Sequence, residues 1–164
     1  MILQLDDWKF DIDMARTMEY SAAEAADHCD CAYCRNFYED VDHATPALRP
    51  FLALFGLHIE APDVLYPYDT ASDRMCYEGK YVVFGSIIQH GSKRFDFGNG
   101  YVYPMNDTEF DLDAPYFVLS LEELEMSWVL DEPLKKVVSP ANLPSFLQKM
   151  WDRLLGKKKN GITS

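Results

Sequence analysis

The sequence predicts an α+β fold, with short N-terminal helices and one C-terminal amphipathic helix packed on a mostly antiparallel sheet of about five or six strands. Helix formers are frequent before residue 57, strand formers fill much of residues 64–130, and a helical pattern returns near the C-terminus. Helices and strands that are segregated in this way are typical of α+β domains. The chain has 164 residues, of which 48% are hydrophobic and 14% aromatic, so we expect one packed domain over residues 1–156.

Four segments of the N-terminal third carry local signals. Residues 2–12 alternate apolar and polar side chains, which predicts half-buried strand. The Ser-Ala-Ala-Glu stretch at residues 21–24 fits a capping box, so a short helix is expected to begin there. A second helix is expected to begin near Cys31, and a third within residues 46–57, where a proline is tolerated in the first turn.

The remaining two thirds of the chain are predicted mainly as strands. The segments rich in β-branched and aromatic residues, separated by glycine-containing turns, are residues 64–66, 76–103, 116–121 and 126–130. The Leu-Glu-Glu-Leu stretch at residues 121–124 fits either a turn or a helix. Apolar residues recur at helical spacing from Leu143 to Leu155, which predicts the amphipathic C-terminal helix. Residues 157–164 form a basic polar tail that we expect to be disordered.

Charge and hydropathy narrow the classes of partner. The net charge is −12 and the isoelectric point is about 4.6, which disfavours nucleic acid because binding depends on Lys and Arg neutralising phosphates. The charge fits either a general role in solubility or an acidic face for a protein partner, which would then be basic. No apolar run approaches the ~20 residues of a membrane span, so no membrane is expected. The first residues lack the basic and apolar regions of a signal peptide, which predicts a cytoplasmic protein.

The most distinctive chemistry lies in the stretch Asp27-His-Cys-Asp-Cys-Ala-Tyr-Cys-Arg-Asn36. Three cysteines within six residues, in a reducing compartment, indicate metal or thiol chemistry. Zinc takes four ligands, usually thiolates and imidazoles, so Cys29, Cys31, Cys34 and His28 are the candidate ligands. Because adjacent side chains tend to point apart, His28 could fail to reach the metal. The other candidates for the fourth ligand are His43, His58 and Cys76.

Three other interpretations of this stretch remain open. Cys31 and Cys34 form a C-x-x-C pair, which is also the pattern of thiol redox proteins. His28-Cys29, five residues, then Arg35 matches the H-C-x5-R pattern of cysteine-dependent phosphatases, although the intervening residues contain no glycine. Reduced cysteines can also simply be buried as small apolar residues.

The function expected from these features is a non-enzymatic interaction or regulatory domain with a cysteine-rich, zinc-binding segment. The alternative is a small metal- or thiol-dependent enzyme that uses residues 29–35. Acidic residues also alternate along residues 107–113, which fits either a hard cation such as Ca²⁺ or a solvated strand edge.

The cysteine segment also resembles known proteins. The pattern Cys-x-Cys-x-x-Cys-Arg-Asn followed by Phe37-Tyr38, then Leu-Arg-Pro-Phe-Leu at residues 48–52 and Gly-Leu-His-Ile at residues 56–59, is similar to short bacterial proteins of uncharacterised function. The likeness spans residues 8–68 and, more loosely, Tyr-x-Gly-x-Tyr at residues 77–81. The resemblance implies a folded domain in a bacterial cytoplasm, and it transfers no catalytic residue.

Overall fold

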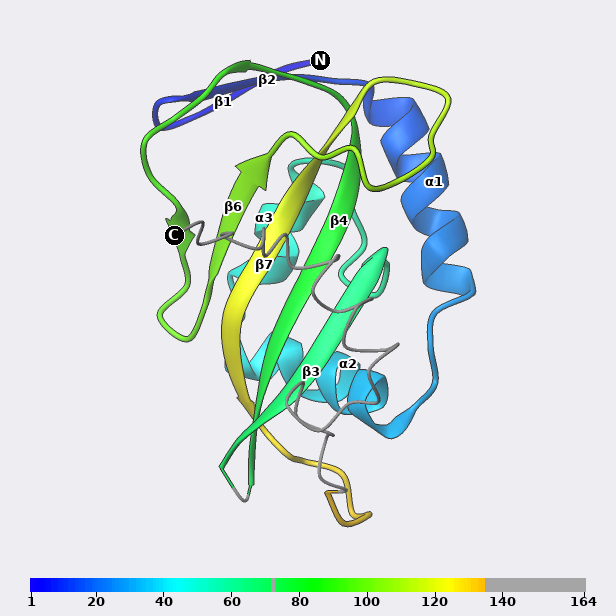
Figure 1. The fold of residues 1–164 in the computed structure, drawn as a ribbon, viewed down its shortest axis with the longest axis vertical. Helices are drawn as coiled ribbons and strands as arrows, with labels where there is room; N and C mark the ends of the chain where they lie inside the picture. The colour runs from blue at the N-terminus through cyan, green and yellow to red at the C-terminus, as the bar shows by residue number, and fades with distance from the viewer. Residues whose placement is uncertain (72, 135–164) are drawn as a thin grey trace, which may run out of the picture. The chain divides into compact units, whose positions relative to one another are not determined.

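A computed structural model describes residues 1–71 and 73–134 of the chain. Within these ranges it contains three helices and a seven-stranded sheet, which confirms the predicted α+β class (Figure 1). The elements, in chain order, are β1 Ile2–Leu5, β2 Trp8–Ile12, α1 Met14–Ala26, α2 Ala32–Ala44, α3 Leu48–Ala53, β3 Val64–Ala71, β4 Arg74–Gln89, β5 Phe95–Asp96, β6 Tyr101–Met105 and β7 Tyr116–Ser127. The helix predicted for residues 143–155 and the tail at residues 157–164 lie outside the described residues.

The sheet is organised around the long strand β4. Its strands follow the order β1-β2-β4-β7-β6-β5, with β3 paired to β4 off this path, and the pairings are antiparallel. One edge of β4 pairs with β7, whereas β3 covers the first half of the other edge and β2 covers the last residues. The sheet has seven strands where about five or six were expected.

Between β3 and β2, side chains take the place of a neighbouring strand on the edge of β4. The backbone N–H of Val82 donates to Asp63 Oδ2 at 2.8 Å, and the N–H of Phe84 donates to Thr17 Oγ1 at 3.1 Å. Asp63 also accepts a 2.5 Å hydrogen bond from the hydroxyl of Tyr20 on α1. Because buried backbone amides must be paired, these contacts let one strand serve two neighbours without leaving open donors.

The core is strongly aromatic and lies between the sheet and the helices. Figure 1 shows α2 and α3 behind the sheet, with α1 along one side. Phe10 stacks on Phe117 at 5.3 Å between ring centroids and meets Phe55 edge-on at 5.2 Å. The hydroxyl of the fully buried Tyr81 donates to the carbonyl oxygen of Ile59 at 2.9 Å. The large side chains fully buried here are Trp8, Tyr77, Tyr81, Phe10, Phe37, Phe55 and Phe117.

Helix α1 begins earlier than predicted. Asp13 caps it by accepting the backbone N–H of Arg16 at 3.2 Å, so the helix extends from Met14 rather than from Ser21. Ser21 is buried within the helix, and its hydroxyl accepts the backbone N–H of His58 at 2.8 Å. The capping box was therefore a wrong interpretation, because the serine hydroxyl bonds a distant segment instead of its own helix.

The stretch at residues 121–124 belongs to strand β7, which is continuous from Tyr116 to Ser127. Its irregularity is confined to Glu123, whose φ of 52° accompanies a shift of register against β4. In the described ranges, no helix is both long enough and apolar enough to cross a membrane.

Candidate metal centre

The cysteine segment forms the connection between α1 and α2. Helix α1 ends at Ala26, and the N–H of the following Asp27 donates to the carbonyl oxygen of Glu24 at 3.1 Å. Cys31 then stands at the N-cap of α2 with extended backbone angles. Consequently Cys29 lies in the loop, Cys31 at its junction with the helix, and Cys34 in the first helical turn.

The three thiols of this segment gather at one point. The sulfur atoms of Cys29, Cys31 and Cys34 all lie within 4.8 Å of one another. Cys29 and Cys31 are exposed, whereas Cys34 is 7% exposed. Thiolates bound to one tetrahedral zinc lie about 3.8 Å apart, given Zn–S bonds of ~2.3 Å. The thiols are therefore close enough to hold one metal ion after small side-chain adjustments.

Arg35 holds the loop that carries the two exposed cysteines. Its Nε donates to the carbonyl oxygen of Asp30 at 3.0 Å, and its guanidinium pairs with the carboxylate of Glu132. The N–H of Cys31 donates to the sulfur of Cys29 at 3.4 Å, which tightens the same loop. In the phosphatase-like interpretation, Arg35 would bind a substrate anion; here its guanidinium is already occupied by a carboxylate.

Asn36 attaches the start of α2 to the end of β7. Its side chain is fully buried, and Nδ2 donates to the hydroxyl of Tyr77 at 3.1 Å and to the carbonyl oxygen of Ser127 at 3.0 Å. Its Oδ1 accepts the backbone N–H of Val129 at 2.7 Å. The Tyr77 hydroxyl in turn donates to the carbonyl oxygen of Tyr33 at 2.9 Å. These bonds fix the helical turn that carries Cys34.

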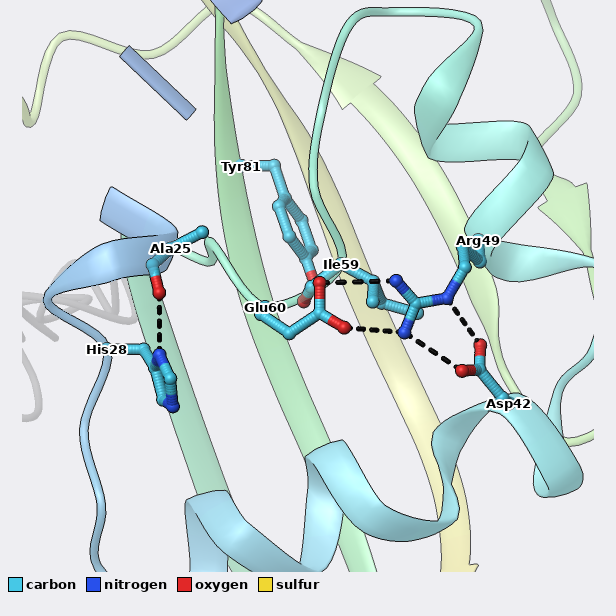
Figure 2. A network of polar contacts seen from close by, with 7 residues as sticks. All are labelled: Ala25, His28, Asp42, Arg49, Ile59, Glu60 and Tyr81. Carbon is cyan, nitrogen blue, oxygen red and sulfur yellow. Dashed lines mark hydrogen bonds and ion pairs between the residues drawn. The ribbon is translucent and has the colours of Figure 1, made fainter. Parts of the chain in front are cut away.

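His28 lies outside the group of three sulfur atoms. Its Nδ1 is 2.6 Å from the carbonyl oxygen of Ala25 (Figure 2). Its ring meets the ring of Tyr38 edge-on, with 4.9 Å between ring centroids. Since a carbonyl oxygen only accepts, Nδ1 carries a proton, and in the neutral imidazole Nε2 then has the lone pair. This is the tautomer that a histidine bound to metal through Nε2 adopts.

The other proposed fourth ligands also lie outside the cluster. His43 is on α2 with its Nδ1 3.3 Å from Asp40. His58 is exposed and follows α3, while Cys76 is buried in β4. Burial, reinforced by nearby glutamates, raises the pKa of Cys76 to about 11.

The electrostatic environments of the clustered thiols differ. Burial acts to raise the pKa of Cys31, but the backbone N–H of Cys34 and the thiol of Cys29 outweigh it and lower that pKa. Burial raises the pKa of Cys34 well above its usual range, and the neighbouring thiols Cys31 and Cys29 add to the increase. The exposed thiol at the helix start is therefore the more readily ionised of these two.

Two other groups of charged residues form ion pairs among themselves. Lys80 Nζ lies 2.8 Å from Asp107 and 2.5 Å from Glu109, so these two carboxylates of the alternating acidic stretch already have a cation. The sequence offered no local signal for this pairing, since Lys80 is on β4.

Arg49 bridges two carboxylates that come from separate segments. Figure 2 shows its guanidinium between the carboxylates of Asp42 and Glu60. The nitrogen–oxygen distances are 2.8 and 2.9 Å to Asp42 and 2.5 and 3.2 Å to Glu60. Pairing with Arg49 lowers the pKa of Asp42. Burial opposes the same effect at Glu60, but the pKa of Glu60 is lowered overall. The bridge ties α2 and α3 to the segment before β3, which is a structural role.

Comparison with protein-family models, with curated proteins and with solved structures finds no match for this chain. The cysteine cluster is thus the feature of the described residues from which a function can be inferred.

Proposed function

We propose that the protein is a non-enzymatic interaction or regulatory domain that binds one Zn²⁺ ion through Cys29, Cys31 and Cys34. The observation that supports this is the convergence of three sulfur atoms within 4.8 Å on a loop held in place by Arg35. Thiolates are the preferred ligands of structural zinc, and a bound cation relieves the repulsion among them.

His28 is the proposed fourth ligand. It precedes Cys29 in the chain, and the hydrogen bond from Nδ1 to the carbonyl oxygen of Ala25 leaves Nε2 able to bind metal. Because His28 is not within 4.8 Å of all three sulfur atoms, ligation requires the imidazole to approach them. A water molecule would otherwise fill the fourth position, as in zinc sites with three protein ligands.

The proposed partner is a basic protein. Residues 1–134 contain 26 of the 27 Asp and Glu residues but only 8 of the 15 Lys and Arg residues. Charge of one sign over a folded surface favours association with the opposite sign, and salt screens it. Binding to a lysine-rich probe peptide should therefore weaken as salt is raised, and salt-independent binding would argue against this partner class.

The metal site is tested by elemental analysis of untagged protein purified under reducing conditions. We expect about one zinc per chain, and less than ~0.1 in a variant with all three clustered cysteines replaced by Ser. Cys76→Ser is the matched control, because this buried cysteine lies outside the cluster. His28→Ala should weaken zinc binding by more than about 10-fold if the imidazole is a ligand, because loss of a group that only orients a ligand already costs about 10–100-fold.

The outcome that would contradict the proposal is equally definite. Unmodified protein that carries less than ~0.1 zinc per chain, takes up none on addition of Zn²⁺ and has freely reactive thiols does not contain this site. An unchanged zinc affinity in His28→Ala would reject His28 alone and leave the three-cysteine site in place.

A further inference from the structure

We propose that Cys31 and Cys34 are a reversible thiol–disulfide couple, and that formation of their disulfide dismantles the metal site. The release of metal rests on the proposed function, whereas the couple itself does not. It is a regulatory reaction of the same cluster, in which the oxidant is a hydroperoxide.

The placement of the two residues supports this couple. Cys31 is the N-cap residue of α2 and Cys34 is the third residue of that helix. Side chains three residues apart at a helix face one another, with ~5–6 Å between Cβ atoms, while a disulfide needs ~3.5–4.5 Å. Cys31 has φ −63° and ψ 158°, outside the helical region, so its backbone can close this difference without unwinding the helix.

Exposure divides the roles of the two thiols. Cys31 is exposed and open to a dissolved oxidant, whereas Cys34 is 7% exposed and has the sulfur atoms of Cys29 and Cys31 within 4.8 Å. Cys29 is also exposed, but it lies in the loop and not at a helix start, the position where reactive cysteines of C-x-x-C pairs are found. The first attack is therefore assigned to Cys31 and the second to Cys34.

The reaction balances with one hydroperoxide. The Cys31 thiolate attacks the peroxide oxygen, the O–O bond breaks, and Cys31 becomes a sulfenic acid while the leaving hydroxide takes up a proton to form water. The Cys34 sulfur then attacks the Cys31 sulfur and displaces hydroxide, which leaves with the Cys34 proton as a second water. Two thiols are oxidised to one disulfide and one peroxide is reduced.

The disulfide removes two of the three thiolates from the metal. Cys29 then remains, with at most the imidazole of His28, and zinc needs about four donors to be held firmly. The ion leaves unchanged as Zn²⁺. Reduction of the disulfide restores the thiols and, with them, the site.

The experiment treats the full-length zinc-loaded protein with one equivalent of hydrogen peroxide. A chromogenic zinc indicator follows release, and peptide mass mapping after alkylation identifies the oxidised cysteines. We expect zinc release in step with a Cys31–Cys34 disulfide, and rebinding after dithiothreitol. Cys76→Ser should behave as the unmodified protein does, because it changes a buried thiol outside the cluster.

Metal-free protein separates this inference from the proposed function. Metal-free Cys29→Ser should still form the Cys31–Cys34 disulfide. The double variant Cys29→Ser/Cys34→Ser, which has no other thiol in the cluster, should stop at the sulfenic acid of Cys31. If zinc does not bind but the disulfide forms, the couple stands and the proposed function fails. If zinc binds but peroxide yields a disulfide with Cys29, over-oxidised Cys31, or no release, the couple is wrong and the zinc site stands.

Discussion

Replacing Asn36 with Ala should lower the free energy of unfolding by about 3 kcal/mol. The fully buried side chain makes three hydrogen bonds, to Tyr77, Ser127 and Val129, and each contributes ~1 kcal/mol net. Ser127 and Val129 are exposed, so water can reach their freed backbone groups and no large further penalty is added. Urea denaturation followed by fluorescence of the three tryptophans measures the loss, with the m-value expected to stay constant.

The Asn36 substitution also has a consequence for the cysteine segment. Asn36 holds the helical turn that carries Cys34, so a looser turn should weaken zinc binding although no ligand is changed. Asn106→Ala is the matched control, because Asn106 is exposed and, within residues 1–71 and 73–134, its side chain makes only a weak 3.4 Å polar contact with His90. Asn106→Ala should lower the free energy of unfolding by less than ~0.5 kcal/mol.

A double-mutant cycle measures how much the hydrogen bond between Asn36 and Tyr77 contributes to stability. Tyr77→Phe removes the hydroxyl that accepts from Asn36, and we expect a coupling energy of about 1 kcal/mol between the two changes. A loss below ~1 kcal/mol for Asn36→Ala at constant m-value would refute the reasoning, because the three bonds would then contribute no net stability.

Three further predictions concern charge, backbone conformation and metal. Arg49→Ala should lower the free energy of unfolding by about 1 kcal/mol at pH 7, because solvent screens its partly exposed ion pairs with Asp42 and Glu60. Carboxylates whose folded-state pKa is lowered add stability that is fully present above their unfolded pKa and is lost as pH falls through the folded-state pKa. In urea melts this difference should therefore begin to shrink near pH ~4 and vanish only below the lowered pKa values of Asp42 and Glu60. Gly85→Ala should lower the free energy of unfolding by at least ~3 kcal/mol, since φ is +136° and the new Cβ would lie 2.0 Å from the backbone oxygen of Asp11. Gly98→Ala is the control: φ is +88° but the space around the new Cβ is open, so the loss should be ~1 kcal/mol. Chelation should lower the thermal midpoint of zinc-loaded protein, and a midpoint unmoved by chelation would mean that the metal does not contribute to folding. Zinc affinity should decrease as the pH is lowered, because the thiols must lose protons to bind the metal.

Much of the local structure follows from short-range patterns. The alternation in residues 2–12 and the strand formers after residue 64 predicted the sheet, and the start of α2 near Cys31 was also predicted. The capping box at Ser21 failed although its local pattern was sound. Its hydroxyl accepts from His58, 37 residues away, and Asp13 caps the helix instead.

For the candidate site, the sequence by itself determined that three thiols would lie near one another, because five peptide bonds separate Cys29 from Cys34 and a loop entering a helix cannot spread them far. Tertiary structure alone decided how the segment is held and how its thiols differ. Asn36 finds its partners 41 to 93 residues away along the chain, and Arg35 pairs with Glu132 at a separation of 97 residues. Packing of α2 on the sheet buries Cys34 and leaves Cys31 exposed. Spacing sets which groups meet within a turn, but burial and long-range partners arise only when distant segments are brought together by the core.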